Sequence, residues 1–197
     1  MTYAIIGSGA IGTALATQFA RNDIDVPVAN SRGPASLADL VGRLGTNIKA
    51  ASVQEALKAD IVILAVPFGS VPETVRNAAA WNGRIIVDAT NAIDFPAFTP
   101  KDLGGRLSTD VVADFVPGAR VVKAFNTLPA AVLASDPAKD GGHRVVFLSG
   151  NDAAANADVA TLIKRLGFSG IDLGKLAEGR LAQFGGPLMV HNLIKQD

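Results

Sequence analysis

Three glycines near the N-terminus have the spacing of a dinucleotide-binding motif. Gly7, Gly9 and Gly12 follow a β-branched and aromatic run, residues 2–6, and precede an alanine- and leucine-rich helical pattern. Strand, G-x-G-x-x-G and helix in this order are the context that the motif requires. The first glycine permits a tight turn, the second lets the backbone approach a pyrophosphate, and the third lets the helix pack on the strand. The helix N-terminus would stabilise the diphosphate.

The segment after the second predicted strand indicates which dinucleotide binds. It reads Asn30-Ser31-Arg32 and holds no carboxylate, whereas an NAD site usually has Asp or Glu there to accept the ribose hydroxyls. A hydroxyl followed by a guanidinium suits a ribose 2′-phosphate, because arginine offers several donors in a fixed fork. We therefore expect NADP(H) rather than NAD. The alternative is a solvated arginine in a loop that leads into a helix.

Side chains suited to acid–base catalysis are scarce. His143 lies in a polar loop and is expected at the surface. His191, near the C-terminus, is expected at the surface or partly buried, and Tyr3 lies too deep in the first strand to be a general acid. Lys123 sits in an apolar strand and is expected to face outward or pair at a strand end, and Asp88 to bond the adjacent loop. Reducing a carbonyl requires a positioned proton donor, whereas hydride transfer to a flavin-like ring mainly requires proximity and orientation. We assign no catalytic side chain and no metal site.

The elements that must position these residues alternate between strand and helix. The predicted strands are residues 2–6, 25–29, 47–51, 60–66, 84–89, 120–125, 144–148 and 170–173. The predicted helices are residues 13–20, 36–44, 52–58, 71–80, 108–115, a short one after Pro129, and 152–166. Residues 177–194, interrupted by Gly185-Gly186-Pro187, are expected to form two short helices.

This alternation predicts a Rossmann-like, doubly wound α/β fold with a mostly parallel sheet. We expect residues 1–197 to form a single NADP-binding domain, with 174–197 as a short C-terminal helical segment. In such a sheet, ligand binds at the carboxyl ends of the strands. The residues expected at the cofactor are Gly7, Ser8, Gly9, Ala10, Ile11, Asn30, Ser31, Arg32, Ala65, Val66, Pro67, Phe68, Thr90, Asn91 and Asn126.

A pocket for the electron acceptor is expected over the nicotinamide. Its residues would be Asn126, Thr127, Leu128, Pro129 and Pro187, helped by the long irregular segment 91–107. The alternative is that Leu128 fills the core and that the C-terminal segment is a dimer contact.

Composition excludes several classes of partner. Lys+Arg and Asp+Glu are both 18, so no net charge favours nucleic acid or an anionic membrane. Cysteine is absent, which excludes disulfides and suits a reducing compartment. The apolar run 61–68 is far shorter than the roughly 20 residues of a membrane span. We expect a cytoplasmic homodimer whose partner is a small-molecule electron acceptor, without nucleic acid or membrane.

Four stretches carry a resemblance to a known family: GSGAIG near the N-terminus, NSR after the second strand, AVPFG after the fourth and VVKAFNTLPA late in the chain. The chain resembles NADPH-dependent reductases of the deazaflavin coenzyme and the NADPH-binding domains of STEAP-type ferric reductases. The resemblance implies that Ser31 and Arg32 hold the 2′-phosphate, that Ala65 to Phe68 lie along the cofactor, and that Asn126 to Pro129 border the nicotinamide. The deazaflavin enzymes often have histidine at Asn126, and they continue further after the last helix.

Three functions stay open at this point. The favoured one is an NADPH:flavin or NADPH:deazaflavin oxidoreductase, with another electron carrier as a further acceptor. The second is a dehydrogenase of a small imine or acid, although such enzymes usually append a large helical substrate domain and the residues after Leu173 are too few to form one. The third is a non-catalytic NADP-sensing or partner-binding module.

Overall fold

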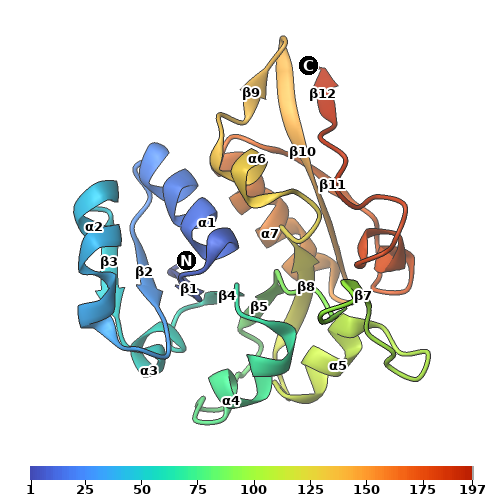
Figure 1. The fold of residues 1–197 in the computed structure, drawn as a ribbon, viewed down its shortest axis with the longest axis horizontal. Helices are drawn as coiled ribbons and strands as arrows, with labels where there is room; N and C mark the ends of the chain where they lie inside the picture. Colours follow the sequence, from blue (N-terminus) through green and yellow to red (C-terminus); the bar gives the residue numbers. More distant parts are fainter. Residues whose placement is uncertain (197) are drawn as a thin grey trace.

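Short apolar runs form the strands of a central sheet in the computed structural model, which describes residues 1–196 (Figure 1). Along the sheet the order is β11-β10-β8-β5-β4-β1-β2-β3. These strands are β1 (Tyr3–Ile6), β2 (Val26–Ala29), β3 (Ile48–Ala51), β4 (Ile61–Leu64), β5 (Ile85–Asp88), β8 (Arg120–Ala124), β10 (Gly142–Gly150) and β11 (Ser169–Asp172). From β3 to β8 all neighbours are parallel. The doubly wound, mostly parallel Rossmann-like fold is therefore confirmed.

The inner strands are buried on both faces, as expected of a parallel sheet covered by helices. In β4, for example, Ile61 and Ile63 belong to one apolar cluster, and Val62 and Leu64 belong to the other. Because successive side chains point to opposite faces, a continuous apolar run serves both cores.

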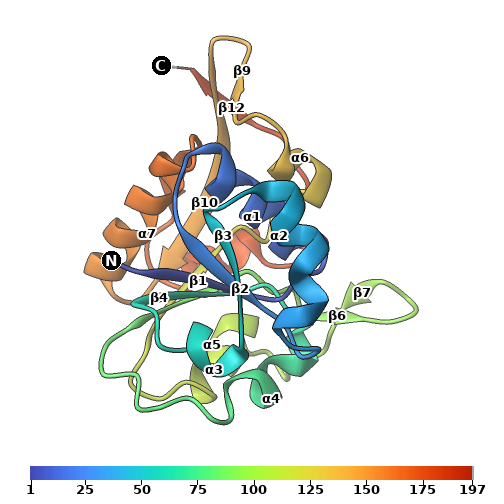
Figure 2. The same cartoon turned by 90° about the vertical axis from the view of Figure 1, so that its left-hand side faces the viewer.

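Helices cover the two faces separately (Figure 2). The helices are α1 (Ala10–Arg21), α2 (Ala38–Leu44), α3 (Val53–Ala56), α4 (Val71–Val75), α5 (Ser108–Asp114), α6 (Ala130–Ala134) and α7 (Ala153–Arg165), with 3-10 turns at Pro34–Leu37, Phe68–Ser70 and Glu178–Ala182. One face carries α1, α2, α6 and α7, and the other carries α3, α4 and α5. Among the residues that the structure describes, no helix combines the length and apolar character needed to cross a membrane.

The far side of the sheet departs from the simple alternation. Strand β10 runs antiparallel to β8 and is longer than predicted, and its first residues also pair with β9 (Ala138–Lys139) and β12 (Ile194–Gln196). After β8 the chain passes through α6 and β9 and enters β10 from the carboxyl edge of the parallel strands. Strand β10 therefore runs opposite to β8. A buried glutamine holds this connection: Gln18 Nε2 of α1 donates to the carbonyl oxygens of Leu133 and Ser135, both at 2.6 Å.

Two helix predictions were wrong in extent. Helix α4 ends at Val75 instead of reaching residue 80, because Ala79 and Ala80 are exposed and bury no apolar face. The two helices predicted over 177–194 are replaced by the 3-10 turn Glu178–Ala182 and a strand, β12. The unpaired edge of β10 offers backbone partners, and this tertiary pairing outweighs local propensity.

The irregular segment 91–107 contains a small hairpin of β6 (Ile93–Asp94) and β7 (Thr99–Pro100). It projects from the carboxyl edge of the sheet (Figure 2). Phe95 and Phe98 at its tip are 68% and 61% exposed, and Phe98 stacks edge-on against Phe184 of the C-terminal segment.

Candidate dinucleotide-binding site

Helix α1 begins at the carboxyl edge of the sheet with uncapped backbone N–H groups. Its N-cap is Gly9, which has no side chain to accept from them, and its first turn holds no acidic residue. The N–H of Thr13 donates to the carbonyl oxygen of Gly9 at 2.9 Å, so the N–H groups before Thr13 have no acceptor within the helix. These donors and the helix dipole together favour an anion at this point.

The three motif positions require glycine for different physical reasons. A Cβ on Gly7, whose φ is +117°, would lie 2.1 Å from the carbonyl oxygen of Ala65, and a Cβ on Gly12 would lie 1.9 Å from the carbonyl oxygen of Gly7. Gly7 is therefore required by the close approach of the chain after β4, and Gly12 is required by the packing of α1 on the end of β1. A Cβ on Gly9 would meet no protein atom within 4 Å. The open space at Gly9 fits a pyrophosphate drawn close to the backbone.

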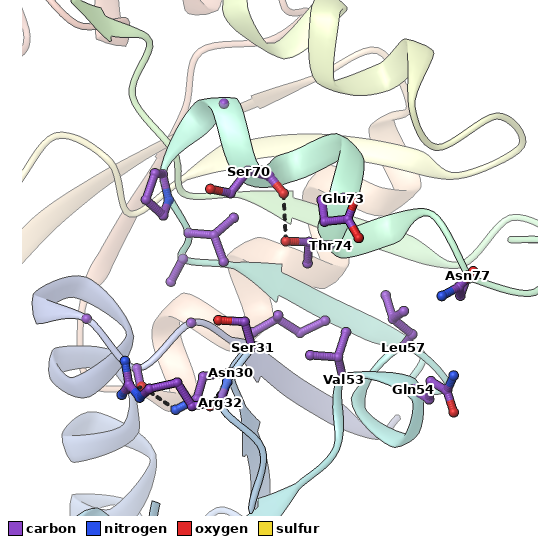
Figure 3. Close-up of a pocket in the computed structure, with 18 residues that line it drawn as sticks. Asn30, Ser31, Arg32, Val53, Gln54, Leu57, Ser70, Glu73, Thr74 and Asn77 are labelled. Carbon is purple, nitrogen blue, oxygen red and sulfur yellow. Dashed lines mark hydrogen bonds between the residues drawn. The ribbon is translucent and has the colours of Figure 1, made fainter. Parts of the chain in front are cut away.

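A cleft of about 710 Å³ lies over the ends of β1, β2 and β4 (Figure 3). It is lined by residues from five chain segments, namely Ile6, Gly7, Ser8 and Gly9; Asn30, Ser31 and Arg32; Val53, Gln54 and Leu57; Ala65, Val66 and Pro67; and Gly69, Ser70, Glu73, Thr74 and Asn77. The first three loops expected at the cofactor therefore meet in one cavity. Ala10 and Ile11 lie in the first turn of α1, at its edge.

The loop after β2 is organised by Asn30, which is 8% exposed. Its Nδ2 donates to Ser8 Oγ at 2.9 Å, and its Oδ1 accepts from the backbone N–H of Arg32 at 2.9 Å. Ser31 and Arg32 stay exposed at the mouth of the cleft, with Arg32 Nη2 3.5 Å from Ser8 Oγ. The guanidinium and the α1 N-terminus therefore flank one space, as a 2′-phosphate and a pyrophosphate of the same molecule require.

The loop after β4 forms one wall of the cleft. Ala65, Val66 and Pro67 line it as expected, while Phe68 packs against the apolar cluster on the α3–α5 face.

Residues of α3 and α4 form the distal end of the cleft, and the sequence prediction missed them. The capping box of Ser52 and Glu55 correctly located the start of α3. It did not show that Val53, Gln54 and Leu57 would face the cleft. Their position directly after β3, at the carboxyl edge, was the available signal.

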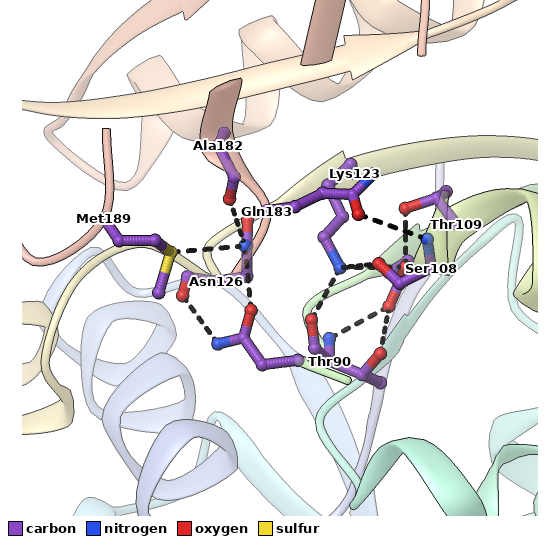
Figure 4. A network of polar contacts seen from close by, with 10 residues as sticks. Thr90, Ser108, Thr109, Lys123, Asn126, Ala182, Gln183 and Met189 are labelled. Carbon is purple, nitrogen blue, oxygen red and sulfur yellow. Dashed lines mark hydrogen bonds and ion pairs between the residues drawn. The ribbon is translucent and has the colours of Figure 1, made fainter. Parts of the chain in front are cut away.

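The ends of β5 and β8 carry a buried polar network rather than an open wall (Figure 4). Asp88 and Lys123 lie opposite each other in the parallel register. Asp88 Oδ1 accepts from the backbone N–H and the hydroxyl of Thr90 at 2.9 and 2.7 Å, as the predicted bond to the adjacent loop requires. Asp88 Oδ2 accepts from Thr109 Oγ1 at 2.9 Å and from Lys123 Nζ at 3.1 Å. Of the two possibilities expected for Lys123, facing outward was wrong, because the residue is 2% exposed. Pairing near a strand end is what the structure has, since Lys123 is one residue from the end of β8 and Asp88 is the last residue of β5.

Asn91 and Asn126 join the same edge. Asn91 Nδ2 donates to the backbone oxygen of Asn126 at 2.9 Å, and Asn126 Nδ2 donates to Asn91 Oδ1 at 3.1 Å and to the carbonyl oxygen of Ala182 at 2.7 Å. Thr90 and Asn126 are 2% and 3% exposed. The C-terminal segment thus contacts Asn126, and neither Thr90 nor Asn126 is among the residues that line the cleft.

The predicted acceptor pocket needs correction at Leu128. This side chain is 4% exposed and belongs to the larger apolar core, so it packs inside the fold, as the alternative interpretation held. Thr127 is also buried, at 2% exposure, whereas Pro129 and Pro187 are exposed. These residues do not form one open apolar surface.

Both histidines lie outside the cleft. His143 is half-buried rather than at the surface, and its Nδ1 lies 2.8 Å from the carbonyl oxygen of Gly167, so Nδ1 carries the proton. His191 is exposed, as expected. Tyr3 is buried, and its hydroxyl accepts from Arg165 at 2.9 Å.

Comparison with known proteins gives a consistent set of relatives. The family model "NADP oxidoreductase coenzyme F420-dependent" matches residues 2–92. The crystal structure of a hypothetical protein from Sinorhizobium meliloti is 59% identical with a TM-score of 0.97, covering 100% of this chain and 96% of that one. The structure of a candidate F420-dependent NADP reductase from Arthrobacter sp. FB24 is 30% identical with a TM-score of 0.77, covering 91% of this chain and 87% of that one.

A similarity to curated proteins covers only part of those proteins. Metalloreductase STEAP3 of Rattus norvegicus is 29% identical over 177 residues, which are 89% of this chain and 34% of the rat protein. The chain spans about a third of the length of the metalloreductases that it matches.

Proposed function

Because the chain belongs to the family of coenzyme F420-dependent NADP oxidoreductases, we propose that it transfers a hydride between NADPH and a flavin or deazaflavin ring. The family and the fold are those of NADP-dependent oxidoreductases. The identity of the acceptor is the part that we add.

The observation that carries the cofactor assignment is the pairing of Gly9 with Arg32 across one cleft. Gly9 leaves open space in front of uncapped N–H groups, and the guanidinium of Arg32 lies beside Ser8 at the same mouth. The donors would hold the pyrophosphate, and Arg32 with Ser31 would hold the 2′-phosphate. No carboxylate at the end of β2 competes for that place, since the residue there is Asn30.

The titratable groups of the cleft support a ring acceptor. Among the lining residues that the structure describes, only Arg32 and Glu73 are charged. Asp88 and Lys123 lie outside this lining and neutralise each other in a buried ion pair. Bound NADPH would supply the hydride, and a flavin-type ring accepts it without a general acid from the protein. The chain would therefore contribute binding, orientation and the exclusion of water.

The relative from Arthrobacter supports a ring as the acceptor. It is a candidate F420-dependent NADP reductase, and this chain is 30% identical to it over 91% of its own length and 87% of that protein.

An acceptor screen tests this proposal. Purified protein is mixed with NADPH and, separately, with flavin mononucleotide, riboflavin, a 5-deazaflavin, a small carbonyl compound and an imine, while the absorbance of NADPH is followed. We expect NADPH consumption only with the ring acceptors. The Gly9→Ala variant, which obstructs the pyrophosphate place, should lose this activity and so exclude a contaminating enzyme. Consumption with the carbonyl or the imine alone, or with no acceptor at all, would contradict the proposal.

A further inference from the structure

The side-chain oxygen of Asn126 is a buried hydrogen-bond acceptor with no donor among residues 1–196. Asn126 is 3% exposed, and a buried polar atom without a partner is costly, of the order of 1–3 kcal/mol. Such an atom in an otherwise satisfied network calls for a ligand that brings the missing donor.

The orientation of this amide is set by its surroundings. Its Nδ2 faces two oxygens, Asn91 Oδ1 at 3.1 Å and the carbonyl oxygen of Ala182 at 2.7 Å, and the sulfur of Met189 at 3.9 Å (Figure 4). Exchanging the nitrogen and the oxygen would place an acceptor against these acceptors and forfeit both hydrogen bonds. The unsatisfied atom is therefore the acceptor Oδ1, and only a hydrogen-bond donor can satisfy it.

The strand order places this acceptor on the nicotinamide side of the sheet. Arg32 follows β2, so the 2′-phosphate and its adenosine extend from the α1 N-terminus toward β2 and β3. The other nucleoside of a dinucleotide must then extend toward β4, β5 and β8, on the opposite side of β1. Asn126 follows the end of β8, and Phe125, which precedes it, has a φ of +62°. A bulky residue rarely adopts this conformation, and strain of this kind gathers at ligand sites.

The cover over Asn126 is thin. Gln183 and Met189 are half-exposed, and Val190 is 65% exposed with a φ of +59° although it is β-branched. Besides the contacts of Asn126 with Ala182 and Met189, two hydrogen bonds tie this stretch to its neighbours. Val190 N–H donates to the carbonyl oxygen of Thr127 at 2.8 Å, and Ser108 N–H donates to Gln183 Oε1 at 3.3 Å.

From these observations we infer that Asn126 Oδ1 accepts a hydrogen bond from the carboxamide N–H of the nicotinamide. Asn126 is then a specificity-determining residue that distinguishes a carboxamide from groups of the same size without an N–H. The inference rests on the proposed use of NADPH, and it adds a contact to the ring that carries the hydride. Asn91 is the positioning residue that holds the amide in place.

The test compares three ligands by direct titration. They are NADPH, its 3-acetylpyridine analogue, in which a methyl ketone replaces the carboxamide, and 2′-phosphoadenosine diphosphate ribose, which has no nicotinamide. The wild-type protein should bind NADPH about three- to tenfold more tightly than the acetylpyridine analogue, the size of one neutral hydrogen bond. In Asn126→Ala the two affinities should become equal, while the affinity for the nicotinamide-free fragment stays at the wild-type value.

Asn156 offers a matched control. Its Oδ1 is also buried without a donor among the described residues, but its Nδ2 donates to the carbonyl oxygens of Gly150 and Gly174, at the ends of β10 and β11. Asn156 lies in α7 and not in the loop after β8. Asn156→Ala should keep the wild-type preference for the carboxamide. Loss of the preference in this variant as well would contradict a specific role of Asn126.

The wild-type protein alone keeps the inference falsifiable if Asn126→Ala does not fold. Equal binding of NADPH and the acetylpyridine analogue by the wild type overturns it, and so does an unchanged preference in a folded Asn126→Ala. Failure of the proposed function looks different, since then no ring acceptor is reduced in the acceptor screen, whether or not NADPH binds with a preference for the carboxamide.

Discussion

Lys123 Nζ and Asp88 Oδ2 form an ion pair at 3.1 Å between β8 and β5, with 3% and 0% of their side-chain surfaces exposed. Lys123 also donates to the carbonyl oxygen of Thr90 at 2.6 Å, while Asp88 accepts from the N–H of Thr90 at 2.9 Å. The pair therefore fixes the loop that carries Asn91, and through Asn91 it fixes Asn126.

Removing one partner of this pair should be costly. We expect Lys123→Met to lower the free energy of unfolding by about 3–5 kcal/mol, because the carboxylate of Asp88 is left buried without its counter-charge. The double variant Lys123→Met with Asp88→Leu should lose less than the single variant. Urea unfolding of the three proteins measures this. A single variant as stable as the wild type would show that the pair contributes nothing.

The motif glycines should separate folding from binding. Gly12→Ala places a Cβ 1.9 Å from the carbonyl oxygen of Gly7 and should destabilise the fold by several kcal/mol. Gly9→Ala meets no protein atom within 4 Å, so its unfolding midpoint should stay within a few degrees of the wild type while NADPH affinity falls at least tenfold. Thermal unfolding and cofactor titration are measured on both variants. Unchanged NADPH affinity in Gly9→Ala would mean that the pyrophosphate lies elsewhere.

Arg32 should decide between the two dinucleotides. Arg32→Ala should weaken NADPH binding by roughly tenfold to a hundredfold, the worth of a charged hydrogen bond, and leave NADH binding nearly unchanged. Arg43→Ala removes an equal charge from α2, outside the lining of the cleft, and serves as the control. Titration of both cofactors against the three proteins is the measurement. Equal losses for NADPH and NADH in Arg32→Ala would assign Arg32 a structural role instead.

Asp60 should contribute to loss of stability in acid. Its carboxylate accepts from the N–H and the hydroxyl of Thr2 at 2.7 and 3.0 Å, and these bonds lower the pKa of Asp60. A lowered pKa in the folded state means that the contribution is complete above the unfolded value, about 3.9, and is lost as the pH falls through the lower folded value. Unfolding free energy measured from pH 5 downward should therefore fall less steeply in Asp60→Asn than in the wild type.

The unfolding free energy of Asp60→Asn should still fall to some extent as the pH is lowered. Hydrogen bonds from Ser52 lower the pKa of Glu55, and the N–H of Ala155 lowers the pKa of Asp152. These two carboxyl groups keep part of the acid sensitivity. Identical slopes for wild type and Asp60→Asn would show that the bonds to Thr2 do not couple to folding.

The local parts of the fold and site could be predicted from the sequence. The β1–α1 unit, the capping box at Ser52 and the exposed Arg32 each depend on neighbours a few residues away, and all three appear in the structure. Their positions follow from spacing alone, because turn geometry and helix capping are local.

The parts that were missed depend on distant partners. Lys123 is buried because Asp88, 35 residues earlier, lies opposite it in the sheet register. Ile194 to Gln196 form a strand because the edge of β10 is free to pair, and Leu128 enters the core because α6 folds back on α1. Composition and periodicity carry no information about these pairings.

Deuterium transfer tests the central claim most directly. NADPH labelled with deuterium at C4 of the nicotinamide, in one stereochemical position or the other, is incubated with the protein and a 5-deazaflavin, whose acceptor atom is carbon and retains the label. A binding site that holds both rings should transfer deuterium from only one of the two labelled forms, and the label should be found on the reduced ring. Three results would contradict the account: reduction that leaves the product unlabelled with both forms, equal transfer from both forms, or no reduction at all.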